Sequence, residues 1–588
     1  MNTDAQELQS PPSPSTVKDI LDLADPSHIA IIAPDGPVLT YVDLKRQVDS
    51  LADKLNSIGI GQEDRVAIIL PNGVEHIVSF LAVIAAGATA APLNPAFTKE
   101  EFRFCLEDAG ARALISSSEK IESLEAILPE SMIAIVTGLD DDGQVSFTSS
   151  ASETGPRMVQ PSSTDDVALV LHTSGTTSRP KRVPLSHRNL VVSAQNIVET
   201  YELTAKDVSL CVMPLFHIHG LVASTLATLI SGGVVVVPAK FNALDFWPAV
   251  EAHHVTWYSA VPTMHQALLH RAKRNAGSEA IAIAKRNLRF IRSCSAPFPP
   301  ETLIDMEETF AVPVLEAYGM TEAAHQVASN PLGSGKRVPG SVGIGTGVSI
   351  AIMDQDGNIE PAGVTGEVVI KGENITLGYE DNPDANRNSF TDGWFRTGDQ
   401  GVLDSEGYLR LVGRLKEIII RSGEKISPQE IDETLLAHPA VAGAVAFGVP
   451  SSTHGEVPSA AVVLRAPGQG RGTGRLLPCA SGRIQMPQGD SRRGRDSSLG
   501  HRQSAAPGRL CSLRLGRVSL PKANTPALFV PWRSQICEDR HRWSRRHRGL
   551  LGRKIGSFGR RCLPDRQGTA SESDAGRWGP GPESGGRL

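Results

Sequence analysis

The apolar and polar positions of residues 17–465 alternate between two patterns. Short apolar runs, such as 65–70 and 166–174, predict buried strands. Longer segments with apolar residues at three- and four-residue spacing predict helices; one covers 187–201, and another ends near Gly87. Strands and helices in regular alternation favour an α/β fold with largely parallel sheets flanked by helices.

The last part of this region has a different pattern. Residues 366–379 and 407–423 alternate with a period of two, which indicates a smaller and partly antiparallel region. Residues 427–450 predict a capped helix followed by a strand, with Ser427 as the N-cap and Glu430 three residues on. We therefore expect a small α+β domain after the large one, and it looks incomplete.

The composition changes abruptly after Leu464. The remaining residues are rich in Gly, Arg, Ser and Pro, contain no tyrosine and show no sustained apolar periodicity. Such a segment buries little apolar surface, so either a disordered tail or an out-of-frame sequence accounts for it. The expected domains are a disordered leader (1–16), a large domain (17–412), the start of a small domain (413–465) and a basic low-complexity tail (466–588).

Several classes of protein are disfavoured by the composition. No apolar run approaches the ~20 residues that a membrane-spanning helix needs. The Pro- and Ser-rich N-terminus has no apolar segment of the kind found in secretory signals. The seven cysteines show no metal-ligand spacing, and the apolar or small-residue contexts of Cys105, Cys211 and Cys294 indicate buried free thiols in a reducing compartment.

Charge divides the chain unequally. Residues 466–588 contain 22 Arg and 2 Lys against 8 acidic residues, a formal charge of +16, and the rest carries −22, which gives −6 in total. A basic tail attracts nucleic-acid backbones, but aromatic residues are sparse there and no folded reader motif is visible. Nucleic-acid binding is therefore disfavoured.

Residues 173–181 read TSGTTSRPK and lie between a predicted strand and a predicted helix. A glycine lets the backbone approach a ligand, hydroxyl groups can donate to phosphate oxygens, and Lys181 adds positive charge. The segment differs from the GxxxxGK[ST] phosphate loop. By itself it fits either an anion-binding loop or an ordinary Ser/Thr-rich surface loop.

Three more motifs follow in order: EAYGMTEAAH at 316–325, GWFRTGD at 393–399 and GRLKEII at 413–419. Together the four motifs resemble the adenylate-forming (AMP-binding) superfamily, which includes acyl-CoA synthetases, luciferases and the adenylation domains of peptide synthetases. The resemblance covers about residues 17–465. PLFHIHGL (214–221) and SGEKISPQEID (422–432) are most similar to oxalate–CoA ligases and fungal peroxisomal acyl-CoA synthetase-like proteins.

This resemblance implies an ATP-dependent acid–CoA ligase that forms an acyl-AMP intermediate and transfers the acyl group to CoA. The implied partners are ATP, Mg²⁺, CoA and a small carboxylic acid. Because two anions must meet, fixed positive charge and Mg²⁺ have to offset their repulsion. The implied catalytic residues are Lys181, Thr321, Glu322 and His217, with Glu322 as the magnesium ligand and Thr321 at the α-phosphate.

The implied ATP-binding residues include Asp399 and Arg414 at the ribose and Tyr318 beside the adenine. Taken singly, each also fits a structural role: Tyr318 as a core aromatic, Asp399 as a turn residue and Arg414 in a surface ion pair. The full set is Thr173, Ser174, Gly175, Thr176, Thr177, Ser178, Ser295, Ala296, Pro297, Glu316, Ala317, Tyr318, Gly319, Met320, Asp399 and Arg414.

The acid and CoA sites follow from the same resemblance. His219 and His325 are candidates for binding the acid, because histidine can supply a donor or a positive charge to a second carboxylate, as oxalate would need. His217 also fits a gate that says nothing about the substrate. Gly423 is expected to leave room for the pantetheine arm of CoA, and Lys416 is the expected hinge.

The sequence departs from the family at two places. Relatives usually have glycine after the loop lysine, where this chain has Arg182; the long side chain either strains the backbone or lies outward and adds charge. Relatives also carry a catalytic lysine in a PKT..GK-like segment. Residues 477–485 resemble that segment faintly, with Arg483 in place of the lysine, but they follow Leu464 too soon for the missing structure, which favours a chance similarity, and we assign no such lysine. The alternative function is therefore a nucleotide-binding remnant, or an adenylating enzyme with impaired catalysis.

The final residues, GRL, weakly resemble the peroxisomal address SKL. The predicted location is therefore cytoplasmic or peroxisomal, and the sequence does not predict an oligomeric state.

Overall fold

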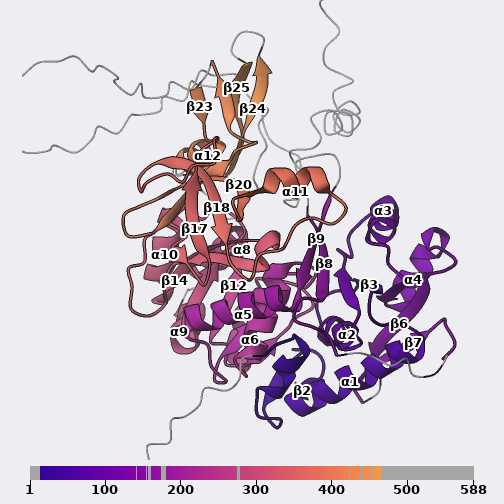
Figure 1. Cartoon of the computed structure of the whole chain (residues 1–588). Helices are drawn as coiled ribbons and strands as arrows, with labels where there is room; N and C mark the ends of the chain where they lie inside the picture. The colour runs from indigo at the N-terminus through magenta and orange to yellow at the C-terminus, as the bar shows by residue number, and fades with distance from the viewer. Residues whose placement is uncertain are drawn as a thin grey trace, which may run out of the picture. The chain divides into compact units, whose positions relative to one another are not determined.

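The computed structural model describes residues 14–140, 142–153, 155, 161–173, 180–274, 278–422, 424–436, 441–451 and 455–464. Figure 1 labels the main helices and strands. The predicted leader 1–16 lies outside these residues except for 14–16, and the predicted tail 466–588 lies outside them entirely.

The first α/β layer is a seven-stranded sheet in the order β7-β6-β5-β3-β4-β8-β9. Its five inner strands are parallel, and the edge strands β7 and β9 run antiparallel to their neighbours. The strands are β3 (Arg65–Ile69), β4 (Thr89–Pro92), β5 (Ala113–Ser116), β6 (Ile133–Leu139), β7 (Val145–Ser149), β8 (Val167–Thr173) and β9 (Lys181–Ser186).

Three of the helices in this part of the chain begin at polar caps, Thr40, Thr98 and Ser117. The Thr98 hydroxyl accepts from the Glu101 N–H while the Glu101 carboxylate accepts from the Thr98 N–H, and Gly110 ends the same helix in the left-handed conformation. Thr40 and Asp43 form a similar box. The helices are η1 (Lys18–Asp22), α1 (Tyr41–Ser57), α2 (Val74–Ala85), α3 (Lys99–Ala109), α4 (Ser118–Leu124) and η2 (Glu125–Ile127).

The second α/β layer is a nine-stranded sheet in the order β16-β15-β14-β13-β12-β10-β11-β1-β2. The six strands from β14 to β1 are parallel, and antiparallel strands extend both edges. They are β1 (Ile29–Ile32), β2 (Val38–Thr40), β10 (Val208–Leu210), β11 (Val234–Val236), β12 (Trp257–Ala260), β13 (Phe290–Ser293), β14 (Val314–Met320), β15 (His325–Ser329) and β16 (Ile344–Gly345).

The helices of this layer include one departure from the expected pattern. The apolar segment after His217 starts as a π-helix, η3 (His219–Leu226), and only then becomes α-helical. π-helical turns often occur at functional sites, and this one begins at a predicted site histidine. The other elements are α5 (His187–Tyr201), α6 (Ala227–Ile230), α7 (Phe246–Ala252), α8 (Pro262–Arg274), α9 (Ser278–Asn287), α10 (Pro300–Phe310) and the short turn η4 (Thr321–Ala323).

Two further sheets follow. A five-stranded antiparallel sheet contains β17 (Ser349–Met353), β18 (Thr365–Lys371), β19 (Phe390–Thr391), β20 (Trp394–Leu403) and β21 (Leu409–Arg414), with α11 (Pro383–Ser389) between its strands. A four-stranded antiparallel sheet contains β22 (Ile419–Arg421), β23 (Glu424–Ile426), β24 (Val441–Ser451) and β25 (Gly455–Leu464), with α12 (Pro428–Leu436).

Three predictions about the smaller elements can be compared with the structure. The Ser427 hydroxyl accepts from the Glu430 N–H at 3.4 Å at the start of α12, so the predicted cap is confirmed. Strand character ends at Lys371, and the predicted strand 366–379 continues as a loop. The domain limits at 412 and 465 stay predictions.

Buried apolar side chains form one large cluster that includes residues from Val17 to Leu409, and a second cluster under α7 to α10. Cys105, Cys211 and Cys294 are buried free thiols, as predicted. In the part of the chain that the structure describes, no helix is long and apolar enough to span a membrane. The expected α/β fold with a smaller antiparallel part is confirmed.

Candidate functional site

The two ends of the hydroxyl-rich segment lie side by side in a β-ladder. Thr173 closes β8 and pairs with Lys181, which opens β9. The Thr173 hydroxyl also donates to the Lys181 carbonyl at 3.5 Å. The predicted phosphate-binding residues Ser174, Gly175, Thr176, Thr177 and Ser178 lie outside the described residues, so Thr173 and Lys181 are the members of this motif with a defined position.

Lys181 lies next to the motif that contains Glu322. Its ammonium nitrogen lies 4.1 Å from the centroid of the Tyr379 ring. The Tyr379 hydroxyl donates to Glu322 Oε1 at 2.8 Å, and Glu322 is only 8% exposed. Partial burial lowers the pKa of Lys181, while attraction to Glu322 opposes that change. A cation and a carboxylate therefore lie on either side of one tyrosine.

A second group of contacts surrounds Asp399 on β20. The Tyr318 hydroxyl donates to Asp399 Oδ2 at 2.5 Å, and Arg414 Nε lies 3.1 Å from Asp399 Oδ1. Asp399 and Arg414 are register partners of β20 and β21. Burial raises the pKa of Asp399, and the charge of Arg414 and the Tyr318 hydrogen bond oppose the rise.

Charge–charge interactions connect these two groups of contacts. Arg414 interacts with Glu322 as well as with Asp399 and Tyr318. Lys416, the predicted hinge, is exposed between β21 and β22, and its charge acts on Lys181. Tertiary structure thus gathers residues from all four sequence motifs in one place.

A further polar group surrounds His219 and His325. His219 Nδ1 is 2.9 Å from the Ser295 hydroxyl, and His219 Nε2 is 2.6 Å from the Ser259 hydroxyl. The rings of His219 and His325 meet edge to face at 5.0 Å. Burial, followed by the charge of Arg292, lowers the pKa of both histidines well below the usual value, so both rings are neutral near pH 7.

Arg292 supplies the positive charge of this group. It lies in the central strand β13 and is 0% exposed. It donates to the Tyr201 hydroxyl at 2.8 Å, to the Ser259 hydroxyl at 2.9 Å and to Gln326 Oε1 at 3.0 Å. Among the described residues, no carboxylate forms an ion pair with Arg292. A buried cation without an anion is costly unless an anionic ligand completes it.

The backbone around the turn is unusually constrained. Ala324 and His325 have φ values of 47° and 118°, and Ser295 has 70°, in the region that favours glycine. Gly319 packs so closely on His325 that a Cβ would lie 2.0 Å from the His325 carbonyl oxygen. This geometry places Glu322 and His325 at the two ends of one short turn.

Glu316, a predicted adenine neighbour, has a buried carboxyl group in β14. It is 6% exposed, and its Oε2 atom has no hydrogen-bond partner among the residues that the structure describes. Burial raises its pKa to about 8, although the backbone N–H groups of Phe298 and Gly340 oppose the shift. The carboxyl group is therefore mainly neutral near pH 7.

Glu316→Gln should remove a pH dependence from the stability of the fold. The unfolded carboxyl group ionises near pH 4.5 and the folded one near 8, so the stability of the wild type falls as pH rises through this window. Each unit of difference corresponds to about 1.4 kcal/mol. Urea denaturation between pH 5 and 9 should show a gain for the variant that grows with pH. Parallel curves for both proteins would contradict the assignment.

The remaining predicted residues are less closely placed. His217 is exposed, with its ring 4.6 Å from that of Phe216, and Gly423 lies outside the described residues. Ala296 and Pro297 follow Ser295 after β13, while Ala317 and Met320 lie in β14.

Two residues of the assembled site were missed from the sequence. Tyr379 lies where a strand was expected. Arg292 is an arginine inside an apolar strand, and that anomaly was the available signal.

Comparisons with known proteins agree with the motifs. The model of the AMP-binding enzyme family matches residues 23–380, and the AMP-binding enzyme C-terminal domain matches residues 430–476. An oxalate–CoA ligase of Arabidopsis thaliana is 47% identical over 443 residues, 73% of this chain and 84% of that protein. An oxalate–CoA ligase of Saccharomyces cerevisiae is 42% identical over 472 residues, 74% of this chain and 86% of that protein.

A solved structure gives the same result. The o-succinylbenzoate CoA synthetase of Bacillus subtilis, in complex with ATP and magnesium ion, matches with a TM-score of 0.66 and 31% sequence identity. The match covers 77% of this chain and 90% of that protein's chain. The predicted superfamily is confirmed. The predicted class of enzyme, an AMP-forming acid–CoA ligase, is confirmed as well and agrees with the named relatives. The chain belongs to the AMP-binding enzyme family.

Proposed function

We propose that this chain joins a small dicarboxylic acid, oxalate in the first place, to CoA at the expense of ATP. A carboxylate oxygen of the acid bonds to the α-phosphorus of ATP as the bond to pyrophosphate breaks, and the CoA thiol then displaces AMP from the acyl-AMP. The observation that carries the proposal is the convergence of Lys181, Glu322, Asp399 and Arg414, together with a buried arginine, Arg292, that forms no ion pair with a carboxylate among the described residues.

The phosphate end of the nucleotide is assigned to the Lys181–Glu322 side. The ammonium group of Lys181 offsets the charge of the phosphates, and the Thr321 hydroxyl donates to the α-phosphate. Tyr379 holds the Glu322 carboxylate in a fixed orientation through the 2.8 Å hydrogen bond. Preorganised groups of this kind act on charge that develops in the transition state.

Glu322 fits a magnesium ion that enters with ATP. Within the described residues, no group of three or more His, Cys, Asp or Glu could hold a metal ion by itself. Mg²⁺ commonly binds through one or two carboxylates together with substrate phosphates, so a single buried carboxylate beside the phosphate end is sufficient. When bound, the ion would offset phosphate charge.

The nucleoside end is assigned to Asp399 and Arg414, whose polar atoms accept from and donate to the ribose hydroxyls. The Tyr318 hydroxyl donates to Asp399, and this hydrogen bond restrains both side chains. The Tyr318 ring is assigned to the adenine. Ser295, Ala296, Pro297 and Glu316 complete the adenine side.

The acid site is assigned to His219, His325 and Arg292. Oxalate has two carboxylates, and only one reacts, so the other needs a positive partner during the reaction. Because both histidines are neutral near pH 7, Arg292 provides the charge and the rings provide hydrogen bonds. Relatives named oxalate–CoA ligase at 42% and 47% identity support this choice. Gly423, Lys416 and His217 keep their predicted roles as the CoA channel, the hinge and the gate.

A second candidate is nucleotide binding with impaired adenylation. Residues 466–588 contain no lysine that we assign to the bridge between carboxylate and α-phosphate, because none of them lies in a complete PKT..GK-like segment. Most of the assigned nucleotide contacts lie before residue 415, so binding does not depend on that lysine.

The test uses the purified full chain with labelled pyrophosphate, ATP and Mg²⁺. Oxalate should drive exchange of pyrophosphate into ATP, acetate should not, and CoA should be required for sustained AMP release. MgATP binding without exchange would favour the second candidate. Failure to bind MgATP would contradict both.

A further inference from the structure

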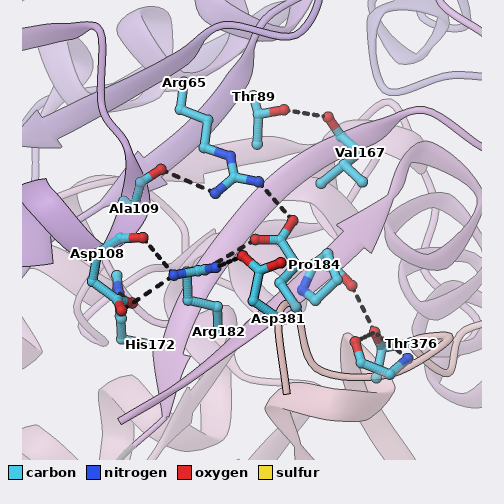
Figure 2. Close-up of polar contacts among 12 residues, drawn as sticks. Arg65, Thr89, Asp108, Ala109, Val167, His172, Arg182, Pro184, Thr376 and Asp381 are labelled. Atoms are coloured by element: carbon cyan, nitrogen blue, oxygen red, sulfur yellow. Dashed lines mark hydrogen bonds and ion pairs between the residues drawn. The ribbon is translucent and has the colours of Figure 1, made fainter. Parts of the chain in front are cut away.

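Arg182, the residue that replaces the usual glycine, is held by three acidic side chains from two segments. Its Nη1 lies 3.2 Å from Asp108 Oδ1, its Nε lies 3.1 Å from Glu380 Oε2, and its Nη2 forms an ion pair with Asp381. Nη1 also donates to the Asp108 carbonyl at 2.5 Å. Figure 2 shows the guanidinium between Asp108 and Asp381.

The backbone at this position is not strained. Arg182 lies in β9 opposite His172, and it is absent from the described residues with positive φ. Its side chain is only 12% exposed. Neither expectation from the sequence therefore holds: the arginine neither forces an unfavourable φ nor projects freely into solvent.

The contacts with Glu380 and Asp381 fasten a loop that carries Tyr379. The Glu380 N–H donates to the Arg182 carbonyl at 3.1 Å, and the Thr376 hydroxyl donates to the Pro184 carbonyl at 2.7 Å. Residues 376–381 are thus attached to β9 at both ends, and Tyr379 lies between the attachments.

The Arg182 contacts are part of a wider network. Arg65 Nη2 lies 2.7 Å from Glu380 Oε1, and Arg65 Nη1 donates to the Ala109 carbonyl at 3.0 Å (Figure 2). His172 Nε2 lies 3.0 Å from Asp108 Oδ2, and burial lowers the pKa of this histidine, so it is neutral near pH 7. Without Arg182, Glu380 would keep its ion pair with Arg65, whereas Asp108 and Asp381 would keep no arginine partner among the described residues. Repulsion between the carboxylates would then push residues 380 and 381 away from β9.

We propose that Arg182 is a positioning residue for the nucleotide site, an inference that rests on the proposed function. By fastening residues 376–381 to β9, it keeps the Tyr379 ring against the Lys181 ammonium group and the Tyr379 hydroxyl on Glu322. Arg182 touches none of the reacting groups; it acts through Tyr379.

The test compares Arg182→Gly, Arg182→Gln and Arg182→Lys with the wild type. The matched control is Arg188→Gln, which removes an exposed ion pair with Asp165 from the next helix. Titration with a fluorescent ATP analogue and Mg²⁺ gives the dissociation constant and the number of sites per chain, and pyrophosphate exchange gives the KM for ATP and for oxalate.

Arg182→Gly and Arg182→Gln should weaken MgATP binding by about tenfold, the usual effect of removing a group that orients a ligand-binding residue. Arg182→Lys should recover part of the loss. The KM for oxalate should change by less than about twofold in all three variants, and the MgATP dissociation constant of the Arg188→Gln control should stay within the same range. Fewer binding sites per chain at an unchanged dissociation constant would indicate a purely structural role and overturn the proposal. A rise in the KM for oxalate equal to the loss in MgATP affinity would overturn it as well.

A double variant separates the network from general destabilisation. Because Arg182 and Glu380 act in one contact, Arg182→Gln with Glu380→Gln should weaken MgATP binding less than the product of the single effects. Independent effects would overturn the proposal. Wild-type chain that fails to bind MgATP would refute the proposed function itself, whereas wild-type binding with unaffected Arg182 variants would refute this inference alone.

Discussion

Glu322→Gln should lower ATP–pyrophosphate exchange by about 100-fold or more, although the side chain keeps its size and shape. The carboxylate is 8% exposed, and its charge acts on Lys181 and Arg414, so its loss leaves two cations without their shared anion. An amide is also a poorer ligand for Mg²⁺ than a carboxylate. Exchange at saturating oxalate, measured over a range of Mg²⁺ concentrations, should show a higher magnesium requirement.

Tyr379→Phe is the graded control for this experiment. It keeps the Glu322 charge and the aromatic ring under Lys181 but removes the 2.8 Å hydrogen bond. A hydrogen bond to a charged group contributes about 1.5–3 kcal/mol, so exchange should fall by roughly 10- to 100-fold, less than for Glu322→Gln. A Glu322→Gln protein with exchange within a few-fold of wild type would remove Glu322 from the reaction.

Arg292→Met should raise the oxalate concentration needed for half-maximal exchange by about 100-fold, while MgATP binding stays within about twofold. The guanidinium is the cation of the proposed acid site, and methionine fills similar space without charge. The Tyr201 hydroxyl keeps its contacts with Gln326 and Ser329, so the substitution leaves few buried polar groups unpaired.

Arg289→Met is the matched control, because Arg289 directly precedes the same strand and pairs with Asp207 instead of facing the histidines. Its oxalate KM should remain near the wild-type value. A matching loss of MgATP binding in Arg292→Met would show that Arg292 supports the fold and does not select the acid.

Local sequence was sufficient for much of the molecule. The period of apolar residues depends on backbone geometry within one element, so β3, α2, β8 and α5 could be predicted from their own residues. The four motifs are contiguous stretches of up to ten residues, and their order along the chain already indicated the adenylate-forming superfamily. The choice of Glu322, Asp399 and Arg414 came from those motifs as well.

Only the tertiary structure showed which side chains meet. Tyr379 and Glu322 are 57 residues apart, and Arg182 and Glu380 are 198 residues apart, so no local period relates them. The charge state of the acid site also depends on burial: His219 and His325 are neutral because they are enclosed beside Arg292, and a sequence does not give desolvation. The sequence by itself determined the helices and strands and the class of chemistry, because both depend on short contiguous segments. Packing between distant segments decided which contacts position the side chains of the candidate site and which group there carries the positive charge.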